Sequence, residues 1–426
     1  MMHTQAYCDM GPPFPSTPCN ICYLYLPTDG SHLYCLFYKS HSVIVMIQLE
    51  QNLHNWLDVD GPYFQQLIYQ SIFYYMAQTH QNEQLKVCIS TSEMDEATWK
   101  YAHRKQIILN GTFGVCSSHM LLFIAMVVDE DGKGVLLALF LFSAPMGNRA
   151  IYAGYNQEIL QELLEKWKMH LSSKDSAVIF YLLVAITDTD PKERGTLQDV
   201  CPCIWLLLCR CNAGLIGTRD YCLPRMLIFG NTMFCRECEI LKFGTSLKYI
   251  GALCRLIYCS LLASTDYNGA VKILADEWVN LLAIAQLGGT SSQAASKLGV
   301  TYVSCLSEMW MPESLWQSWS QKGHSVASSI LKILIEGVLP TTNHLELFNL
   351  VLKQKHIPRW QCSGSCLHFD FLIQILINNI LPDIFVTHIS IKAYQAWLTE
   401  QFEKLAGGVD LVDSKTRSSK QGVVCW

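Results

Sequence analysis

Residues 106–145 read QIILNGTFGVCSSHMLLFIAMVVDEDGKGVLLALFLFSAP, and this stretch decides the fold. Three apolar runs follow one another within it, at Ile107–Leu109, Met120–Val128 and Val135–Phe142. The last two runs are separated by Asp129–Gly134, an Asp- and Gly-rich turn of the kind that joins antiparallel strands. The stretch therefore predicts a meander of three antiparallel strands.

Helices and strands alternate after this meander. Asn156–Leu171 has apolar residues at spacings of three and four, which predicts an amphipathic helix. Ala177–Ile186 and Cys203–Cys209 are continuous apolar runs, typical of strands buried on both faces, and a helix is expected between them at about residues 192–200. Three antiparallel strands followed by helix, strand, helix and strand is the order of an RNase H-like domain. The sequence therefore predicts an α/β fold, an RNase H-like mixed sheet flanked by helices.

The alternation stops in the second half of the chain. Residues 213–325 are helical, Cys-rich and irregular, which is typical of a helical insertion into such a domain. Residues 91–212 are then the first part of the core, and residues 326–406, where N-cap residues precede a further helix, are its C-terminal part. Residues 1–90 are expected as a divergent N-terminal region without sustained periodicity, and residues 407–426 as a flexible tail.

Composition limits the classes of function. Of the 426 residues, 50% are hydrophobic and 16% are charged, which is enough to bury a large core. The net charge of -5 excludes a uniformly basic surface, so contact with nucleic acid needs local Lys and Arg clusters. The 19 cysteines form no repeating framework, and we expect reduced thiols. We expect no secretory signal, because residues 1–18 carry Gly, Pro and polar residues in place of a basic stretch followed by an apolar run. We expect no membrane partner, since the longest apolar runs noted fall short of the roughly 20 residues that span a bilayer.

Three positions in this arrangement suit phosphodiester chemistry. Asn110 ends the first expected strand, Asp188 ends the fourth, and Glu346 lies on the helix that follows the insertion. Cleavage by a two-metal site needs three carboxylates that converge from distant parts of the chain. Mg2+ prefers oxygen ligands together with water and substrate phosphate. We therefore predict catalytic positions at Asn110, Asp188 and Glu346, with Asp188 and Glu346 as the metal ligands.

Short motifs around these positions occur at Asn110–Val115, Asp129–Gly134, Phe142–Pro145, Ala185–Asp190 and Pro340–Asn349. Together they resemble the fungal-type transposases of Mutator-like elements, and the resemblance covers about residues 90–405. That family has Asp-Gly-Thr-Phe at the first motif, Thr-Asp at the second and Asn-His-x-Glu-x-Phe-Asn at the third. The resemblance implies a nuclear DDE-type transposase, with two Mg2+ ions, that cleaves and joins the DNA of element terminal inverted repeats. It also implies a homo-oligomer.

Two departures from the family pattern predict an inactive or impaired enzyme. Asn110 stands where the family has its first metal-bridging Asp, and an amide offers one neutral oxygen in place of a charged, bidentate group. The family's Cys-x-x-His appears here as Cys209–Asn212, without the His. In His356–Asp370 the family tends to have Arg at several positions where this chain has other residues. Such replacements are what C-to-T decay of Arg codons would produce. The alternatives are a degenerate transposase copy and a non-catalytic derivative that binds DNA or protein.

The predicted site residues also have purely structural interpretations. Asp188 could be a helix N-cap, although Asp190 before Pro191 is better placed for that role. Glu346 could be a solvated helix residue. His344 could orient a water molecule or bind the scissile phosphate, or it could cap the first helical turn.

Basic residues close to Glu346 suit a phosphate backbone, and a solvated basic helix end is equally consistent with them. The DNA-binding candidates are His344, Lys353, Lys355 and Arg359.

Two further patterns were weighed as binding sites. Cys19–Cys22 and Cys235–Cys238 each supply half of a zinc site, but more than 200 residues separate the pairs, so zinc is not expected. A cysteine-rich metal-binding interaction module remains a third class of function. Ser291–Thr301 resembles the turn of a helix-turn-helix, but Tyr302–Leu306 has almost no side chain that could read bases. We expect an ordinary helix pair there.

Overall fold

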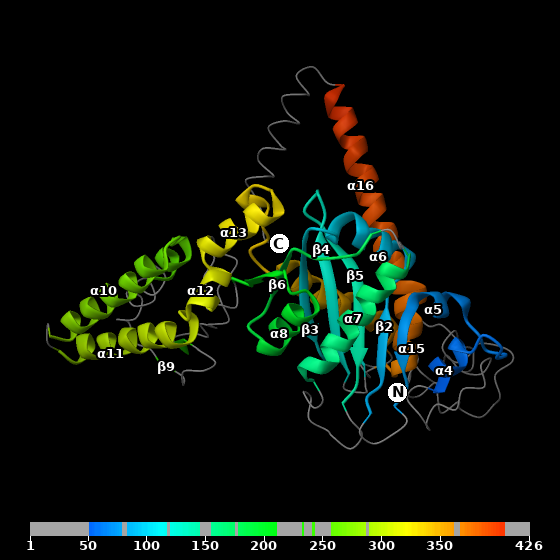
Figure 1. Ribbon diagram of the computed structural model, residues 1–426, viewed down its shortest axis with the longest axis horizontal. Helices are drawn as coiled ribbons and strands as arrows, with labels where there is room; N and C mark the ends of the chain where they lie inside the picture. Colours follow the sequence, from blue (N-terminus) through cyan, green and yellow to red (C-terminus); the bar gives the residue numbers. More distant parts are fainter. Residues whose placement is uncertain are drawn as a thin grey trace, which may run out of the picture. The chain divides into compact units, whose positions relative to one another are not determined.

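The computed structural model describes residues 51–78, 83–116, 120–144, 155–174, 178–210, 232–233, 241–242, 257–286, 289–361 and 367–404. These residues form a mixed α/β protein, in which a seven-stranded mixed sheet is followed by a largely helical C-terminal region (Figure 1).

The sheet has the strand order β1-β2-β5-β4-β3-β6-β7. The pairs β1–β2, β2–β5 and β4–β5 are antiparallel, whereas β3–β6 and β6–β7 are parallel. The sheet is therefore antiparallel toward one edge and parallel toward the other. Its strands are β1 (Ile72–Met76), β2 (Lys86–Ile89), β3 (Gln106–Thr112), β4 (Leu121–Val128), β5 (Gly134–Phe142), β6 (Val184–Thr187) and β7 (Trp205–Leu208).

The described residues divide into two compact units. The first unit holds the residues up to Tyr101, Asn110–Phe180 and those from His344 onward. The second unit holds Ala102–Leu109 and Tyr181–Asn343.

The core of the first unit forms where β4 and β5 are buried along almost their whole length. The predicted turn between them is confirmed: Asp129 Oδ1 accepts hydrogen bonds from the backbone N–H of Asp131 (3.0 Å) and Lys133 (2.9 Å), and Gly132 has φ of 74°. A positive φ suits glycine, which has no Cβ to clash. The Asp and Gly of this turn therefore fix the hairpin.

Several helices of the first unit pack against its strands, among them α6 against β5 and α7 against β1. The predicted amphipathic helix is confirmed as α7 (Gln157–Lys174), in which all six of the apolar residues that made the pattern are buried. One of them, Trp167, packs edge-on against Phe140 of β5 with ring centroids 5.9 Å apart. The other helices of this unit are α4 (Gln51–Leu57), α5 (Gln66–Ser71), α6 (Ser92–Ala97), α14 (Asn343–Val351, whose first residue belongs to the second unit), α15 (Phe369–Ile375) and α16 (Leu381–Glu403).

The second unit combines the short parallel strands with a helical region. Its hydrophobic cluster includes Tyr258, Trp316 and Trp319, all almost fully buried. Its helices are α8 (Pro191–Val200), α10 (Tyr267–Gln286), α11 (Thr290–Cys305), α12 (Glu313–Trp319) and α13 (Gln321–Leu331).

Ser291–Thr301 is not the turn of a helix-turn-helix, because α11 runs through the whole segment without a turn. Gly299 serves packing instead, because a Cβ there would lie 2.3 Å from the Leu281 side chain of α10. Ser296 Oγ donates a hydrogen bond to the carbonyl oxygen of Leu281 at 2.6 Å. The small residues therefore bring α10 and α11 close together, as an ordinary helix pair.

Two expected strands are shorter than predicted. Of Ala177–Ile186, only the end is a strand, in β6, and Cys203–Cys209 contributes β7 alone. Phe180, in the part that is not a strand, is 2% exposed because it packs against Trp99 and Trp167. Phe180 is therefore buried by ring packing rather than by strand pairing, whereas Val178 and Ile179 beside it are exposed.

Residues 369–403 form a continuous helical stretch that length and composition would allow to cross a membrane. However, 61% of its most apolar window is buried inside the protein, so this is weak support for a membrane span. That no membrane partner exists stays a prediction.

Candidate functional site

Asn110 lies near the end of β3, after three fully buried residues of the strand. Its side chain is half-buried, and its Oδ1 accepts a hydrogen bond from the backbone N–H of Gly111 at 2.7 Å. A backbone donor requires an acceptor, so this contact fixes which end of the amide faces Gly111. The other end of the amide is an NH2 group, a donor, where a carboxylate would offer a second oxygen.

Glu346 lies on α14, and the helix predicted to follow the N-cap residues is thereby confirmed. Its side chain is exposed in the first turn. The helix continues through a π-helical turn at Leu352–His356, and there Lys353 Nζ donates to Thr112 Oγ1 of β3 at 2.6 Å. Glu346 and Lys353 are seven residues apart, about two helical turns, and so share one side of the helix. The helix that carries Glu346 is thereby attached to the strand that carries Asn110.

Asp188 belongs to the second unit, directly after β6. The N-cap of α8 is Asp190, as its position before Pro191 predicts, with Asp190 Oδ1 accepting from the backbone N–H of Lys192 at 2.9 Å. The capping interpretation of Asp188 is therefore wrong. Asn110 and Glu346 lie in the first unit, and convergence of all three positions stays a prediction.

Glu193, on the first turn of α8, was not identified from the sequence. It is 2% exposed, and its Oε1 has no hydrogen-bond partner among the residues that the structure describes. Burial raises the pKa of Glu193 well above its ordinary value, and repulsion from Asp188 and Asp190 raises it further, against a weaker opposing effect of Arg194. A Glu in the first turn of a helix is usually solvated, so the sequence offered no signal.

Cys209, the first residue of the motif that lacks its His, has a structural role. Its Sγ accepts hydrogen bonds from the backbone N–H (3.3 Å) and the hydroxyl (3.2 Å) of Thr342, and the Arg210 N–H donates to the Pro340 carbonyl at 3.0 Å. Burial lowers the pKa of Arg210 to about 10. These contacts tie the end of β7 to the segment that leads into α14. Asn212 lies outside the described residues.

The other DNA-binding candidates differ in their surroundings. Lys355 and Arg359 are exposed, on the π-helical turn and the 3-10 turn that follows it. Burial and the nearby Lys133 lower the pKa of His344, although Asp129 acts in the opposite direction. His344 therefore adds no positive charge at neutral pH.

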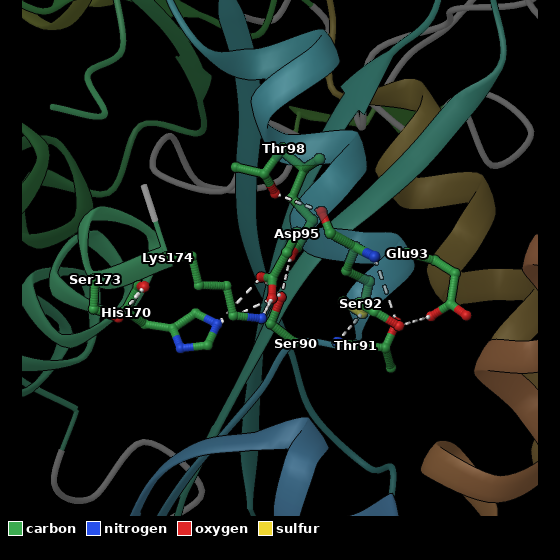
Figure 2. A network of polar contacts seen from close by, with 11 residues as sticks. Ser90, Thr91, Ser92, Glu93, Asp95, Thr98, His170, Ser173 and Lys174 are labelled. Atoms are coloured by element: carbon green, nitrogen blue, oxygen red, sulfur yellow. Dashed lines mark hydrogen bonds and ion pairs between the residues drawn. The ribbon is translucent and has the colours of Figure 1, made fainter. Parts of the chain in front are cut away.

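A buried carboxylate network lies elsewhere in the first unit, around Asp95 of α6 (Figure 2). Asp95 accepts from Ser90 Oγ at 2.6 Å, from His170 Nε2 at 3.1 Å and from Lys174 Nζ. Burial would raise the pKa of Asp95, but hydrogen bonds from these three residues outweigh it and lower the pKa. Because Ser90 donates to Asp95 rather than to His170, the network lacks a nucleophile paired with a base. Its role is to fix α6 and α7.

Metal binding by several side chains has limited support in the described ranges. They contain no group of three or more His, Cys, Asp or Glu side chains that could hold a metal ion. Both cysteine pairs weighed for zinc lie outside these ranges. The predicted site has two carboxylates, Asp188 and Glu346, because its third position is the amide Asn110.

A scan against models of protein families finds no match to this chain, and a search of curated proteins finds no related sequence.

Proposed function

We propose that this chain is a transposase-derived protein with an RNase H-like core, whose metal-dependent cleavage and joining of DNA is lost or severely impaired. The observation that carries the proposal is the order of five strands, β5-β4-β3-β6-β7. In this order the first strand of the meander, β3, lies at the centre and pairs in parallel with β6, the first strand after the meander.

The register of these two strands supports the choice of site residues. Ile108 pairs with Ile186, and Asn110 and Asp188 each follow two residues later. Parallel strands present their carboxyl ends at the same edge of a sheet, where sites of α/β folds are built. The attachment of Lys353 to Thr112 supports a position for Glu346 near the same strand.

The orientation of Asn110 supports loss of activity. Its one oxygen is already bound to the Gly111 N–H, so the residue does not fit the role of a metal-bridging ligand as it stands. We therefore assign no cleavage step through metal ions to the unaltered chain. The non-catalytic derivative that binds DNA is the second candidate. The ammonium group of Lys353 favours it, because that group is partly buried and bonded to a neutral hydroxyl.

Nicking of supercoiled plasmid DNA in Mg2+ or Mn2+ tests the proposal. The Asn110→Asp variant is expected to cleave roughly a thousandfold faster than the unaltered chain, about 4 kcal/mol in the barrier at about 1.4 kcal/mol per factor of ten. The double variant Asn110→Asp with Asp188→Asn is the control and should be inactive. Rapid metal-dependent cleavage by the unaltered chain would overturn the claim of impairment. Failure of Asn110→Asp to cleave, with the protein folded, would leave the non-catalytic alternative.

A further inference from the structure

We propose that the beginning of α13, together with Arg210 and His324, forms a binding site for a small oxyanion of the phosphate type. The site lies within the second unit, where Arg210 follows β7 and Ser320 is the N-cap of α13. It shares no residue with the predicted catalytic site and does not depend on the proposed function.

The first turn of α13 has backbone N–H groups that no N-cap side chain uses. The first N–H groups of a helix have no partner inside the helix, and the N-cap side chain usually accepts from one of them. Ser320 is the N-cap of α13, but its side chain makes no such bond. The peptide dipoles of this 11-residue helix add partial positive charge at the same end. Such a helix end attracts anions.

Two buried side chains at this helix end have polar atoms without partners. Ser320 is 0% exposed and His324 is 2% exposed. Among the residues that the structure describes, neither Ser320 Oγ nor His324 Nε2 has a hydrogen-bond partner. The backbone N–H of His324 donates to the Ser320 carbonyl oxygen at 3.3 Å, so the two residues lie one helical turn apart. Leaving such buried groups unsatisfied costs free energy, and a ligand would satisfy them.

The guanidinium group of Arg210 adds a full positive charge. Its Nε donates to the Trp319 carbonyl oxygen at 3.1 Å, and its Nη2 lies 3.5 Å from Gln321 Oε1. These contacts hold the group at the junction of α12 and α13. A guanidinium has five N–H donors, so those on Nη1 remain for a ligand. Burial lowers the pKa of Arg210 to about 10, which leaves the group charged at neutral pH.

The described carboxylates do not neutralise this charge. Besides burial, Tyr258 affects the pKa of Arg210, and Arg210 itself affects that of His324. Asp188 and Glu346, the carboxylates of the predicted catalytic site, contribute to neither shift. An anion held between Arg210 and His324 would therefore meet no strong repulsion from them.

These donors suit an oxyanion better than a water molecule. Burial and the charge of Arg210 lower the pKa of His324 to about 3, so its imidazole is neutral at pH 7 and can carry a proton on Nε2. A water molecule could pair with Ser320 and His324, but it would leave the charge of Arg210 uncompensated. Arg210 and Gln321 are partly exposed, so a free phosphate ion or the terminal phosphate of a nucleic acid can enter from their side.

Isothermal titration calorimetry of the full chain with inorganic phosphate, at constant ionic strength, tests the proposal. We expect saturable binding. Arg210→Gln should weaken it roughly tenfold, because a charge-assisted hydrogen bond is lost. Ser320→Ala should weaken it roughly fivefold and leave the urea unfolding midpoint unchanged, because the Ser320 hydroxyl bonds to none of the described residues.

Two controls keep the result interpretable. Ser329→Ala removes an exposed hydroxyl later in α13, and Lys297→Gln removes an exposed charge of α11 in the same unit. Both should bind phosphate as the unaltered chain does. Because Arg210→Gln also removes the bond to Trp319, Ser320→Ala keeps the test valid if that variant fails to fold.

Oligonucleotides with a 5′-phosphate or a 5′-hydroxyl separate the two sources of the ligand. Binding of the phosphorylated one alone, in competition with inorganic phosphate, identifies a terminal phosphate of nucleic acid, whereas binding of inorganic phosphate alone identifies the free ion. The proposal is overturned if phosphate binding is not saturable, or if Ser320→Ala binds phosphate as tightly as the unaltered chain.

Discussion

Glu193 carries its carboxyl group into the interior of the second unit, where one oxygen lacks a hydrogen bond among the described residues. Its raised pKa means that the folded protein binds a proton at pH values where the unfolded chain has released it. Stability from this group is fully present below the unfolded pKa near 4.5 and is lost as pH rises through the folded pKa.

Replacing Glu193 by Gln should therefore stabilise the protein at pH 8 but not at pH 4.5. The gain is expected at pH 8 because the folded protein must there either keep a proton on this buried carboxyl group or bury its charge, and Gln does neither. Urea denaturation at both pH values measures it. Glu308→Gln, at an exposed position of the same unit, is the matched control and should show no gain. An equal effect of Glu193→Gln at both pH values would contradict the prediction.

The sequence predicted which element carries a residue more readily than it predicted which way the side chain of that residue points. Asn110 and Glu346 were predicted at a strand end and on a helix, and they occupy such places. The sequence did not reveal that the Asn110 oxygen faces its own backbone or that Lys353 contacts Thr112. Both facts depend on contacts between segments or on local backbone direction, which residue types alone do not encode.

At the scale of elements, the junction of α12 and α13 depends on a glycine. Ser320 alone separates the two helices, and a Cβ at Gly323 would lie 1.6 Å from the backbone carbonyl oxygen of Gln317. The Gly323 carbonyl also accepts a hydrogen bond from Trp205 Nε1 at 3.2 Å. The backbone at this point cannot move without disturbing β7.

Gly323→Ala should therefore cost about 3 kcal/mol or more, because the clash is with backbone atoms. Thermal and urea unfolding of the purified variant measure the loss. Gly269→Ala, early in α10, is the control, because a Cβ there would meet only the Asp266 side chain. It should change stability by less than about 1 kcal/mol, the helix preference of Ala over Gly. A stable Gly323→Ala variant would show that the two helices are not packed this closely.

Elements with a clear period were predicted best. The spacing of three and four in α7 predicted both the helix and its buried face. β1 and β2, in the region expected to be divergent, were missed because four or five residues are too few to establish an alternating pattern. The helix-turn-helix resemblance failed because a glycine was taken for a turn, when α11 needs it for contact with α10.

At the scale of the whole molecule, the sequence predicted β3 to β7 and their order along the chain, but not the two-residue strands Thr232–Met233 and Leu241–Lys242. It did not predict that β1 and β2 extend the sheet beyond β5. Tertiary contacts determine which strands pair, so the residues of an edge strand do not by themselves identify its partner. Convergence of the three predicted site positions likewise needs a measurement on the complete chain.

Stabilisation by Mg2+ supplies that measurement, because a ligand that binds the folded state alone raises the free energy of unfolding of the chain. The unaltered protein should show no change in about 10 mM Mg2+. Asn110→Asp should gain about 1.4 kcal/mol if its dissociation constant is about 1 mM. If the three positions form one site, the gain depends on Asp188 of the second unit as well as on positions 110 and 346 of the first.

Removing either partner then decides whether the acids converge. Asn110→Asp combined with Asp188→Asn, or with Glu346→Gln, should lose the gain, because Mg2+ bound by a single carboxylate is held weakly. Asn110→Asp combined with Asp190→Asn is the control and should keep the gain, because Asn also serves as the N-cap of a helix such as α8. If the gain survives the loss of Asp188, the metal is bound within the first unit, and the three positions do not form one site.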